Sequence, residues 1–253
     1  MKVKKILVSQ PKPTSEKSPY FEIARKHNVE LVFRPFIKVE GLSAKEFRQQ
    51  KVSIGEHTAV IFTAKTAIDH FFRLAEEMRV HIPDTMKYFC TSESIANYLQ
   101  KYIVYRKRKI FAGKTGTLAE LLPSMLKHKN EKFLLAVSNV NDGNAEGLLA
   151  QNNLNFSRAE MYRTVSNDFS DDEPFDYDML VFFSPQGIES LKKNFPDFSQ
   201  GDIAIATFGT STAELAKEAG LRVDIEAPTV KAPSMTAAID TYLNDNNDRA
   251  EAV

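Results

Sequence analysis

The sequence contains no tryptophan and only one cysteine, Cys90, among its 253 residues. A single cysteine excludes an internal disulfide and favours a reducing compartment, and at the end of a predicted strand it is typically a buried structural thiol. No stretch approaches the roughly 18 apolar residues of a membrane-spanning helix. The first apolar run, residues 6–8, is too short for a signal peptide. We therefore expect a cytoplasmic protein with no membrane contact.

An excess of either charge is also missing, because 33 Lys and Arg residues balance 33 Asp and Glu residues. This balance argues against nucleic-acid binding through bulk electrostatic attraction. The basic run "YRKRK" at residues 105–109 is typical of a solvated surface, and a role in steering a charged ligand is the alternative.

Motifs for metals, nucleotides and a nucleophilic serine are missing as well. The five histidines are scattered, with no pair at the spacing of zinc ligands. The segment "FAGKTGT" (residues 111–117) resembles a phosphate-binding loop, but Arg108 stands where that motif needs its first glycine. A dinucleotide fingerprint needs three glycines where "FGTSTAELAKEAG" has one, and no Gly-x-Ser-x-Gly elbow occurs. We expect neither a metal nor an organic cofactor.

Short apolar runs alternate with helical patterns along the whole chain. Strands are predicted at residues 6–8, 30–37, 59–63, 87–90, 133–137, 179–183, 203–207 and 223–225. Helices are predicted at residues 18–26, 65–77, 92–102, 117–126, 143–150, 187–194, 211–219 and 235–243, with Gly220 as a helix stop. This alternation predicts βαβ units, and hence α/β architecture with parallel sheets flanked by helices.

Two long, partly polar extended segments, residues 30–41 and 157–168, interrupt the alternation and flank the central part of the chain. If they pair, the chain builds a discontinuous domain from residues 1–37 and 168–253 and an inserted domain from 41–157. The linkers would then be residues 33–41 and 157–167. The alternative is one large sheet with two edge strands. The polar, aperiodic tail at residues 244–253 is predicted to be disordered.

One strand–turn–helix pattern occurs twice. Aligning Ala64 with Ser184 superimposes "VIF" of "TAVIFTAKTAIDHF" on "LVF" of "DMLVFFSPQGIESL". Several predicted strands also end in small polar residues: Thr63, Thr91, Ser92, Ser138, Asn139, Ser184, Thr210, Ser211 and Thr212. Such residues cap helices, which explains some of them. The carboxyl ends of parallel strands also face ligands, and helix N-termini bind anions, so an anion-binding role is the functional alternative.

The order of these segments carries a family resemblance. "VFFSPQGIESL", "IATFGTSTAELAKEAGLRVDIEAP" and "PSMTAAIDTYL" resemble the C-terminal half of uroporphyrinogen-III synthases. "VIFTAKTAIDHF" and "AEMYRTV" resemble earlier elements of that family, so the likeness spans most of the chain. The sequence departs from the family pattern at three positions: Ala64 replaces Ser, Thr91 replaces Gly, and Gln10 replaces Arg.

The resemblance implies two α/β domains joined by a two-stranded β ribbon, with the active site in the cleft between them. It implies a monomeric lyase without metal or organic cofactor. The implied substrate is hydroxymethylbilane, a linear tetrapyrrole with eight carboxylates. The enzyme dehydrates and cyclises it with inversion of ring D to give uroporphyrinogen III in heme biosynthesis. The alternative is a non-catalytic two-domain sensor of a small polyanion.

Candidate site residues follow from the resemblance and the predicted strand ends together. Tyr162, on the returning strand, is the candidate to hydrogen-bond the departing hydroxyl, and packing at the domain junction is its alternative role. The expected substrate-binding residues are Thr63, Ala64, Lys65, Ser92, Ser138, Asn139, Ser184, Pro185, Gln186, Gly187, Thr210, Ser211 and Thr212. We expect them to bind acetate and propionate groups largely through backbone N–H groups.

Overall fold

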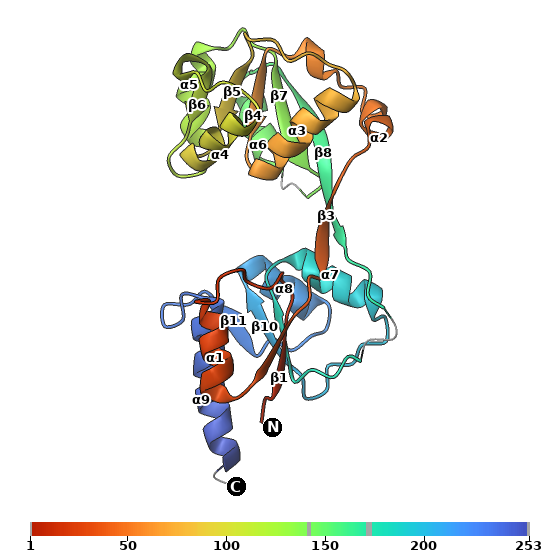
Figure 1. Ribbon diagram of the computed structural model, residues 1–253, viewed down its shortest axis with the longest axis vertical. Helices are drawn as coiled ribbons and strands as arrows, with labels where there is room; N and C mark the ends of the chain where they lie inside the picture. Colours follow the sequence, from red (N-terminus) through yellow and green to blue (C-terminus); the bar gives the residue numbers. More distant parts are fainter. Residues whose placement is uncertain (1, 141–142, 171–173, 252–253) are drawn as a thin grey trace. The chain divides into compact units, whose positions relative to one another are not determined.

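The computed structural model describes residues 2–140, 143–170 and 174–251, and for residues 247–251 the backbone alone. The chain forms two compact units (Figure 1). Unit 1 comprises Met1–Lys38 and Val165–Val253, and unit 2 comprises Val39–Thr164. The sequence pattern predicts the corresponding boundaries at residues 37 and 168 for unit 1 and at residues 41 and 157 for unit 2.

Unit 1 contains a five-stranded parallel sheet. Its strands are β1 (Lys5–Val8), β2 (Glu30–Phe33), β9 (Met179–Phe182), β10 (Ala204–Phe208) and β11 (Ile225–Ala227). They lie in the order β11-β10-β9-β1-β2, and each neighbouring pair is parallel. All strands therefore end at one edge of the sheet.

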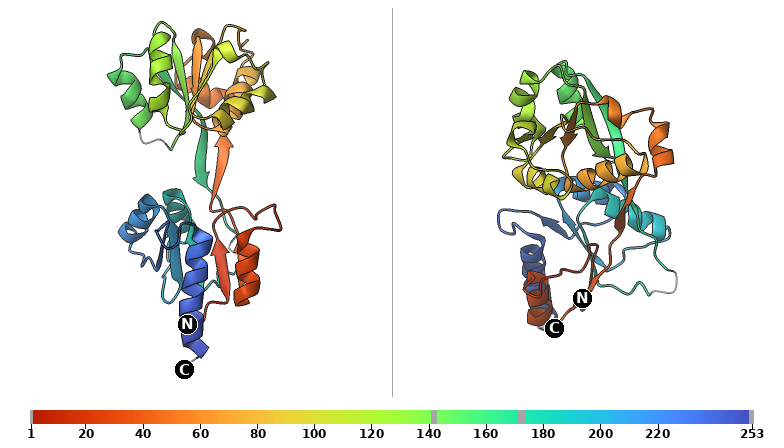
Figure 2. Two further views of the ribbon diagram at one scale, coloured as in Figure 1. Left: turned by 90° about the vertical axis from the view of Figure 1, so that its left-hand side faces the viewer. Right: turned by 45° about the horizontal axis from the view of Figure 1, so that its top comes forward.

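Helices cover both faces of this sheet, which explains why its central strands are apolar at consecutive positions. Helices α1 (Pro19–His27) and α9 (Met235–Glu251) lie side by side on one face (Figures 1 and 2). They pack Ile23 and Ile239 against Ile6 and Val181. Helices α7 (Pro185–Asn194) and α8 (Thr210–Glu218) cover the other face, where Ile188 joins the cluster of alternate strand residues.

Unit 2 contains a six-stranded sheet in the order β3-β8-β7-β4-β5-β6. Its strands are β3 (Ile37–Gly41), β4 (Ala59–Phe62), β5 (Lys87–Cys90), β6 (Ile110–Ala112), β7 (Phe133–Ser138) and β8 (Phe156–Ser166). The five strands from β4 to β8 are paired in parallel. This sheet is also buried on both faces, because Val60 and Phe62 belong to one apolar cluster and Ile61 to the other.

The helices of unit 2 are short except for one. Those on one face are α2 (Ala44–Gln49), α3 (Lys65–Glu77) and α4 (Glu93–Tyr98), the last continued by a 3₁₀ turn at Leu99–Lys101. Those on the other face are a 3₁₀ turn at Leu118–Leu121, α5 (Leu122–Lys127) and α6 (Asn144–Gln151). Further 3₁₀ turns lie at Ile54–Glu56 and Lys107–Lys109.

The two sheets share one strand order. Taken from β8, unit 2 reads β8-β7-β4-β5-β6, and unit 1 reads β2-β1-β9-β10-β11. The chain order of unit 1 is a circular permutation of that of unit 2, and β9 occupies the place of β4. The similarity between the "VIFTAK" and "VFFSPQ" segments therefore coincides with equivalent positions in the two sheets.

The structure confirms the predicted α/β class with parallel sheets flanked by helices. The chain crosses between the units at Lys38/Val39 and at Thr164/Val165, and both crossings lie in β3 and β8, which are neighbours in the sheet. The predicted strand at residues 30–37 is in fact two strands of different sheets, β2 and β3, with Pro35 in the segment between them. Gly220 adopts φ 77° after α8, as its predicted role as a helix stop requires.

Three further elements differ from the predictions. Helix α2 is absent from the predicted set, although Ser43 and Glu46 form a capping box that signals its start. Strand β6 also escapes prediction, since three residues carry too little periodicity. Helix α9 continues to Glu251, where disorder is predicted, because a helix packed in its first turns can extend through polar residues. Residues 252–253 of the predicted tail lie outside the described residues. None of the described helices is long and apolar enough to cross a bilayer.

Asp69 on α3 illustrates how polar groups hold unit 2 together. Its carboxylate accepts hydrogen bonds from the Tyr98 hydroxyl at 3.0 Å, from Lys101 Nζ at 2.8 Å and from the Tyr102 hydroxyl. Burial by itself raises the pKa of Asp69, but the hydrogen bonds from Lys101, Tyr102 and Tyr98 outweigh it, so the pKa lies below its ordinary value.

We predict that Asp69→Asn lowers the free energy of unfolding by about 1 kcal/mol at pH 7, an estimate that allows for solvent screening of a partly exposed carboxylate. Because the folded pKa is lowered, this contribution is present above the unfolded pKa, about 4, and is lost as the pH falls through the folded value. Urea titrations of both proteins between pH 7 and pH 3 would measure it. Asp84→Asn, at a side chain that is 90% exposed, is the control. A constant difference between Asp69→Asn and wild type across this range would contradict the prediction.

Candidate functional site

The strand order of unit 1 creates a topological switch point between β1 and β9. The chain proceeds from β1 outward to β2 on one side, and from β9 outward to β10 and β11 on the other. In open parallel sheets, the connections that leave such a pair of strands diverge and open a crevice at the strand carboxyl ends. A pocket of about 330 Å³ lies at this place, lined by Ser9, Gln10, Pro11, Pro35, Ile37, Phe183, Ser184 and Gly187.

Ser184 connects β9 to α7 and is the first predicted binding residue in this pocket. It occupies the N-cap of α7 in an extended conformation, φ −154° and ψ 154°, but its side chain makes no cap hydrogen bond. Pro185 follows at the first helical position and contributes no N–H group. Within the described residues, the side chains of Ser184 and Gln186 have no hydrogen-bond partner. The start of α7 therefore offers unpaired polar groups to a ligand.

Gly187 is buried one turn into α7, and its position has a packing reason. A Cβ atom at this residue would lie 3.1 Å from Cδ1 of Phe182, the last residue of β9. Phe182 is fully buried and its ring contacts Phe36 edge to face, with ring centroids 5.3 Å apart. Glycine thus lets the first turn of α7 lie close to the end of β9, next to the pocket.

The neighbouring strand β10 leads into α8 through Gly209, which adopts φ 87° and ψ 145°. Thr210, Ser211 and Thr212 form the first turn of α8, and no side chain caps this helix. The backbone N–H groups of a first helical turn lack intrahelical partners. Thr210 and Ser211 are exposed, whereas Thr212 is buried. These three residues lie one strand away from the pocket and do not line it.

Unit 2 has its own switch point, between β4 and β7. Thr63, Ala64 and Lys65 follow β4, and Ala64 is the N-cap of α3 with φ −148° and ψ 152°. This conformation differs by only a few degrees from that of Ser184, so the aligned pair of residues builds the same backbone joint. Lys65 is exposed, and its Nζ lies 5.6 Å from the ring centroid of Tyr98.

Three other predicted binding residues use their side chains within unit 2. Ser92 caps α4 by accepting a hydrogen bond from the N–H of Ile95 at 3.3 Å. The Ser138 hydroxyl donates to the carbonyl of Val140 at 2.8 Å. Asn139 accepts from the N–H of Thr164 at 2.8 Å. These side chains shape the loops at the strand ends, and the Ser92 hydroxyl keeps its own proton for a further contact.

Tyr162 is brought to this edge by a β-bulge. Along β7 and β8, Val137 pairs with Glu160 but Ser138 pairs with Tyr162, so Met161 is the additional residue. A bulge of this kind changes the direction in which the following side chain points. The ring of Tyr162 stacks on His70 of α3, with centroids 5.3 Å apart.

The environment of Tyr162 keeps its phenol protonated. Burial raises the pKa above its ordinary value, and hydrogen bonding to Ser138 offsets only part of that effect. Burial, together with the nearby positive charge of Arg73, lowers the pKa of His70. The stacked pair is therefore a neutral phenol and a neutral imidazole at pH 7, and the phenol can donate a hydrogen bond.

The described residues form neither a metal site nor a reactive thiol. Within the described part of the chain, no three side chains of His, Cys, Asp or Glu form a cluster that could hold a metal ion. Cys90 is fully buried, and burial raises the pKa of its thiol to about 12, as expected for a structural residue. The arrangement is suited to binding anions and donating hydrogen bonds.

Six residues of the pocket were not among the predicted binding residues: Ser9, Gln10, Pro11, Pro35, Ile37 and Phe183. Gln10 is visible in the sequence only as a departure from the family pattern. The others have no local signal, because their proximity depends on β1 and β9 being neighbours. That pairing joins residues about 170 positions apart, for example Val8 with Val181.

A pair of helix glycines provides a matched test of the packing at the pocket. Alanine in a helix interior is more favourable than glycine by up to about 1 kcal/mol. A Cβ atom at Gly147 in α6 would have no neighbour within 4 Å, so Gly147→Ala should raise the free energy of unfolding by about that amount. Gly187→Ala should lose this gain through the contact with Phe182, and Gly187→Val should lower stability by about 2 kcal/mol. Denaturant titrations would measure all three variants, and an equal gain for the two alanine variants would contradict the proposed close packing.

Solved structures of known proteins share the fold of this chain. The search of curated proteins found no significant match. Among solved structures, uroporphyrinogen-III synthetase from Helicobacter pylori matches with a TM-score of 0.60 at 15% identity, covering 96% of this chain and 100% of that chain. A mutant uroporphyrinogen III synthase from Thermus thermophilus matches with a TM-score of 0.54 at 13% identity, covering 97% and 99%. At such low identity, these likenesses show a shared fold.

The sequence match is more specific than the structural ones. The family model described as uroporphyrinogen-III synthase HemD matches residues 18–237, which include all of unit 2 and most of unit 1, and β1 precedes the matched range. It covers most of the 253 residues, in a single match. The chain belongs to the uroporphyrinogen-III synthase family.

Proposed function

We propose that this chain is a uroporphyrinogen-III synthase that dehydrates and cyclises hydroxymethylbilane with inversion of ring D. Family membership supports the reaction. The observation in the structure that supports it best is the pocket at the β1/β9 switch point, which adjoins the uncapped start of α7. A substrate with eight carboxylates needs many hydrogen-bond donors, and helix starts supply them from the backbone.

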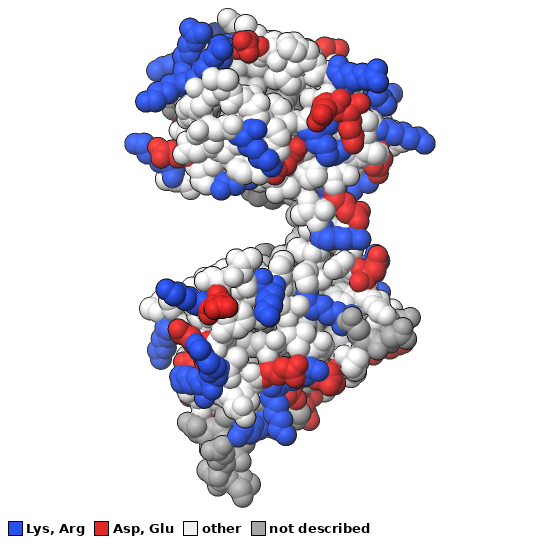
Figure 3. All heavy atoms as spheres, in the orientation of Figure 1, with Lys and Arg blue, Asp and Glu red and all other residues white. Residues whose placement is uncertain are grey.

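Backbone donors also fit the charge of the chain. Lys and Arg balance Asp and Glu in number, and Figure 3 shows both kinds interspersed on the visible faces of the two units. A polyanion can nevertheless bind where helix dipoles and unpaired N–H groups converge, because their effect is local. We assign this role to the starts of α7 and α8 in unit 1 and to the start of α3 in unit 2. Thr63, Lys65, Ser184, Gln186, Thr210 and Ser211 have side chains available for further contacts.

Tyr162 is our candidate for assisting the loss of the hydroxyl group. Departure of hydroxide from the hydroxymethyl carbon leaves a cation stabilised by the pyrrole nitrogen, and a proton donated to the leaving oxygen completes a water molecule. A neutral phenol with a raised pKa can donate that hydrogen bond at pH 7. Ring D then attacks through its substituted carbon, the resulting spiro intermediate fragments and recloses, and a proton leaves to restore the pyrrole. Holding the two terminal rings in place favours this path over direct closure.

The decisive experiment supplies hydroxymethylbilane, generated enzymatically, and separates the type I and type III isomers of the product. We expect the type III isomer in excess over the uncatalysed type I closure. The result that contradicts the proposal is type I product alone at the uncatalysed rate. Binding of hydroxymethylbilane without type III product would instead support the alternative function, a non-catalytic sensor of a polyanionic ligand.

The role of Tyr162 can be tested separately. We predict that Tyr162→Phe lowers kcat by about tenfold with little change in KM, because the phenol acts on the leaving group. The pyrrole nitrogen drives departure, so the effect should fall below the range typical of general acids. Tyr20→Phe, at a partly buried phenol in α1 of unit 1, is the control and should retain full activity. Unchanged turnover in Tyr162→Phe would leave Tyr162 with a packing role at His70.

The cytoplasmic location, the monomeric state and a cleft between the domains stay predictions.

A further inference from the structure

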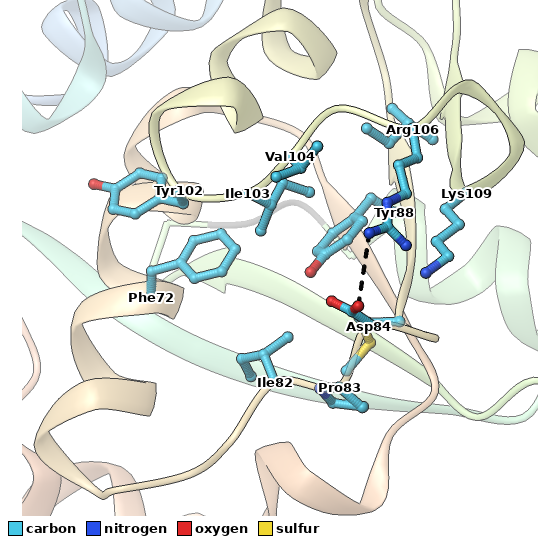
Figure 4. A pocket seen from close by; sticks show the side chains of 12 residues that line it. Phe72, Ile82, Pro83, Asp84, Tyr88, Tyr102, Ile103, Val104, Arg106 and Lys109 are labelled. Carbon is cyan, nitrogen blue, oxygen red and sulfur yellow. Dashed lines mark ion pairs between the residues drawn. The ribbon is translucent and has the colours of Figure 1, made fainter.

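Unit 2 contains a pocket at the edge of its sheet opposite to the strand carboxyl ends. It lies at the amino ends of β5 and β6, beside the middle of α3, and has a volume of about 370 Å³ (Figure 4). This volume falls within the range of small-molecule sites in proteins. The proposed reaction uses none of its residues.

The wall of this pocket is apolar and held in place. The rings of Phe72 and Tyr102 are stacked, with centroids 4.6 Å apart and an angle of 6° between their planes. The Tyr102 hydroxyl donates to Asp69, which fixes the ring from its outer end. Ile82 and Ile103 also line the pocket, and Figure 4 shows them and Phe72 surrounding a common space. A flat apolar group would fit against this wall.

Tyr88 places an unused donor in the pocket. The residue is 4% exposed, and Figure 4 shows its hydroxyl directed into the cavity. Within the described residues, this hydroxyl has no hydrogen-bond partner. Burial, with a further contribution from Asp84, raises the pKa of Tyr88, so the hydroxyl remains a donor at any ordinary pH. The hydroxyl is accessible from the pocket, so a ligand with an acceptor atom can receive its hydrogen bond.

Two basic residues lie at the mouth of the pocket. Arg106 and Lys109 both line the pocket, and Figure 4 shows the Lys109 ammonium turned toward it. Arg106 is 3.7 Å from the exposed carboxylate of Asp84, whereas Lys109 has no ion pair among the described residues. Figure 3 shows Lys and Arg side chains gathered on the side of unit 2 that carries α5 and β6. The basic run at residues 105–109 therefore contributes one charge that is free to meet an anion.

We propose that this pocket binds a small aromatic carboxylate that carries a hydrogen-bond acceptor on its ring. The carboxylate meets Lys109 at the mouth, the ring lies against Phe72 and Ile103, and the acceptor receives the hydrogen bond of the Tyr88 hydroxyl. The site is separate from the strand carboxyl ends, so its occupant need not be a tetrapyrrole.

Three probes separate these contributions. 6-Hydroxy-2-naphthoate carries both polar groups, 2-naphthoate lacks the ring hydroxyl, and 2-naphthol lacks the carboxylate. Titration calorimetry should show the first binding most tightly, with the other two weaker by about fivefold to tenfold each. Tyr88→Phe should remove the advantage of the ring hydroxyl, and Lys109→Gln the advantage of the carboxylate. Lys107→Gln, in the same basic run but outside the pocket lining, should change neither.

Two further measurements test where the probes bind and whether the Tyr88 hydroxyl is free in the folded protein. Amide shifts in the ¹⁵N spectrum should move at Tyr88, Ile103 and Ile110, and shifts confined to Ser184 and Gly187 would overturn the proposal. Tyr88→Phe without ligand should unfold at about the same temperature as wild type, because the hydroxyl has no hydrogen-bond partner among the described residues. A lower unfolding temperature would show that the hydroxyl is already bonded in the folded protein. Equal affinity for the three probes, or no binding, would also overturn the proposal.

Discussion

The parallel arrangement of strands, covered by helices on both faces, is the constraint on which the other features of this protein depend. It requires continuous apolar strands such as "AVIF" in β4 and "MLVF" in β9, which are fully buried. It also places every strand end, and therefore every following helix start, at one edge of a sheet. Unpaired backbone N–H groups accumulate there without any charged residue being needed. The candidate site of each unit is a consequence of this geometry.

The joints between strands and helices show how one backbone conformation serves different purposes. Ala64, Ser92 and Ser184 are N-caps with nearly the same φ and ψ angles. Ser92 uses its hydroxyl to cap its own helix, Ala64 has none, and Ser184 keeps its hydroxyl free beside a pocket. The conformation follows from the parallel sheet, since each strand must turn sharply into a helix that packs back on it. The side chain then decides whether the joint is closed or open to a ligand.

The two candidate ligand sites in unit 2 differ in chemistry because they lie at opposite edges of the same sheet. At the carboxyl edge, the donors are mainly backbone groups, with Tyr162 added by a bulge in β8. At the amino edge, helices end rather than begin, so polar contacts must come from side chains such as Tyr88 and Lys109. A ligand at the carboxyl edge is therefore recognised by a general preference for anions. A ligand at the amino edge is recognised by the positions of a few specific groups.

Local sequence patterns were enough to predict the class of fold, most strands and helices, the helix stop at Gly220 and the repeated joint at Ala64 and Ser184. These features depend on local periodicity and on residues whose backbone preferences act over a few positions. Tertiary structure decided which strands are neighbours, and hence that Ser9 and Gln10 meet Ser184 in one pocket. It also decided that Ser92, Ser138 and Asn139 bond within the protein, and that Met161 forms a bulge before Tyr162. The physical reason is that pairing between β1 and β9 joins residues about 170 positions apart, and no local preference encodes a contact at that distance.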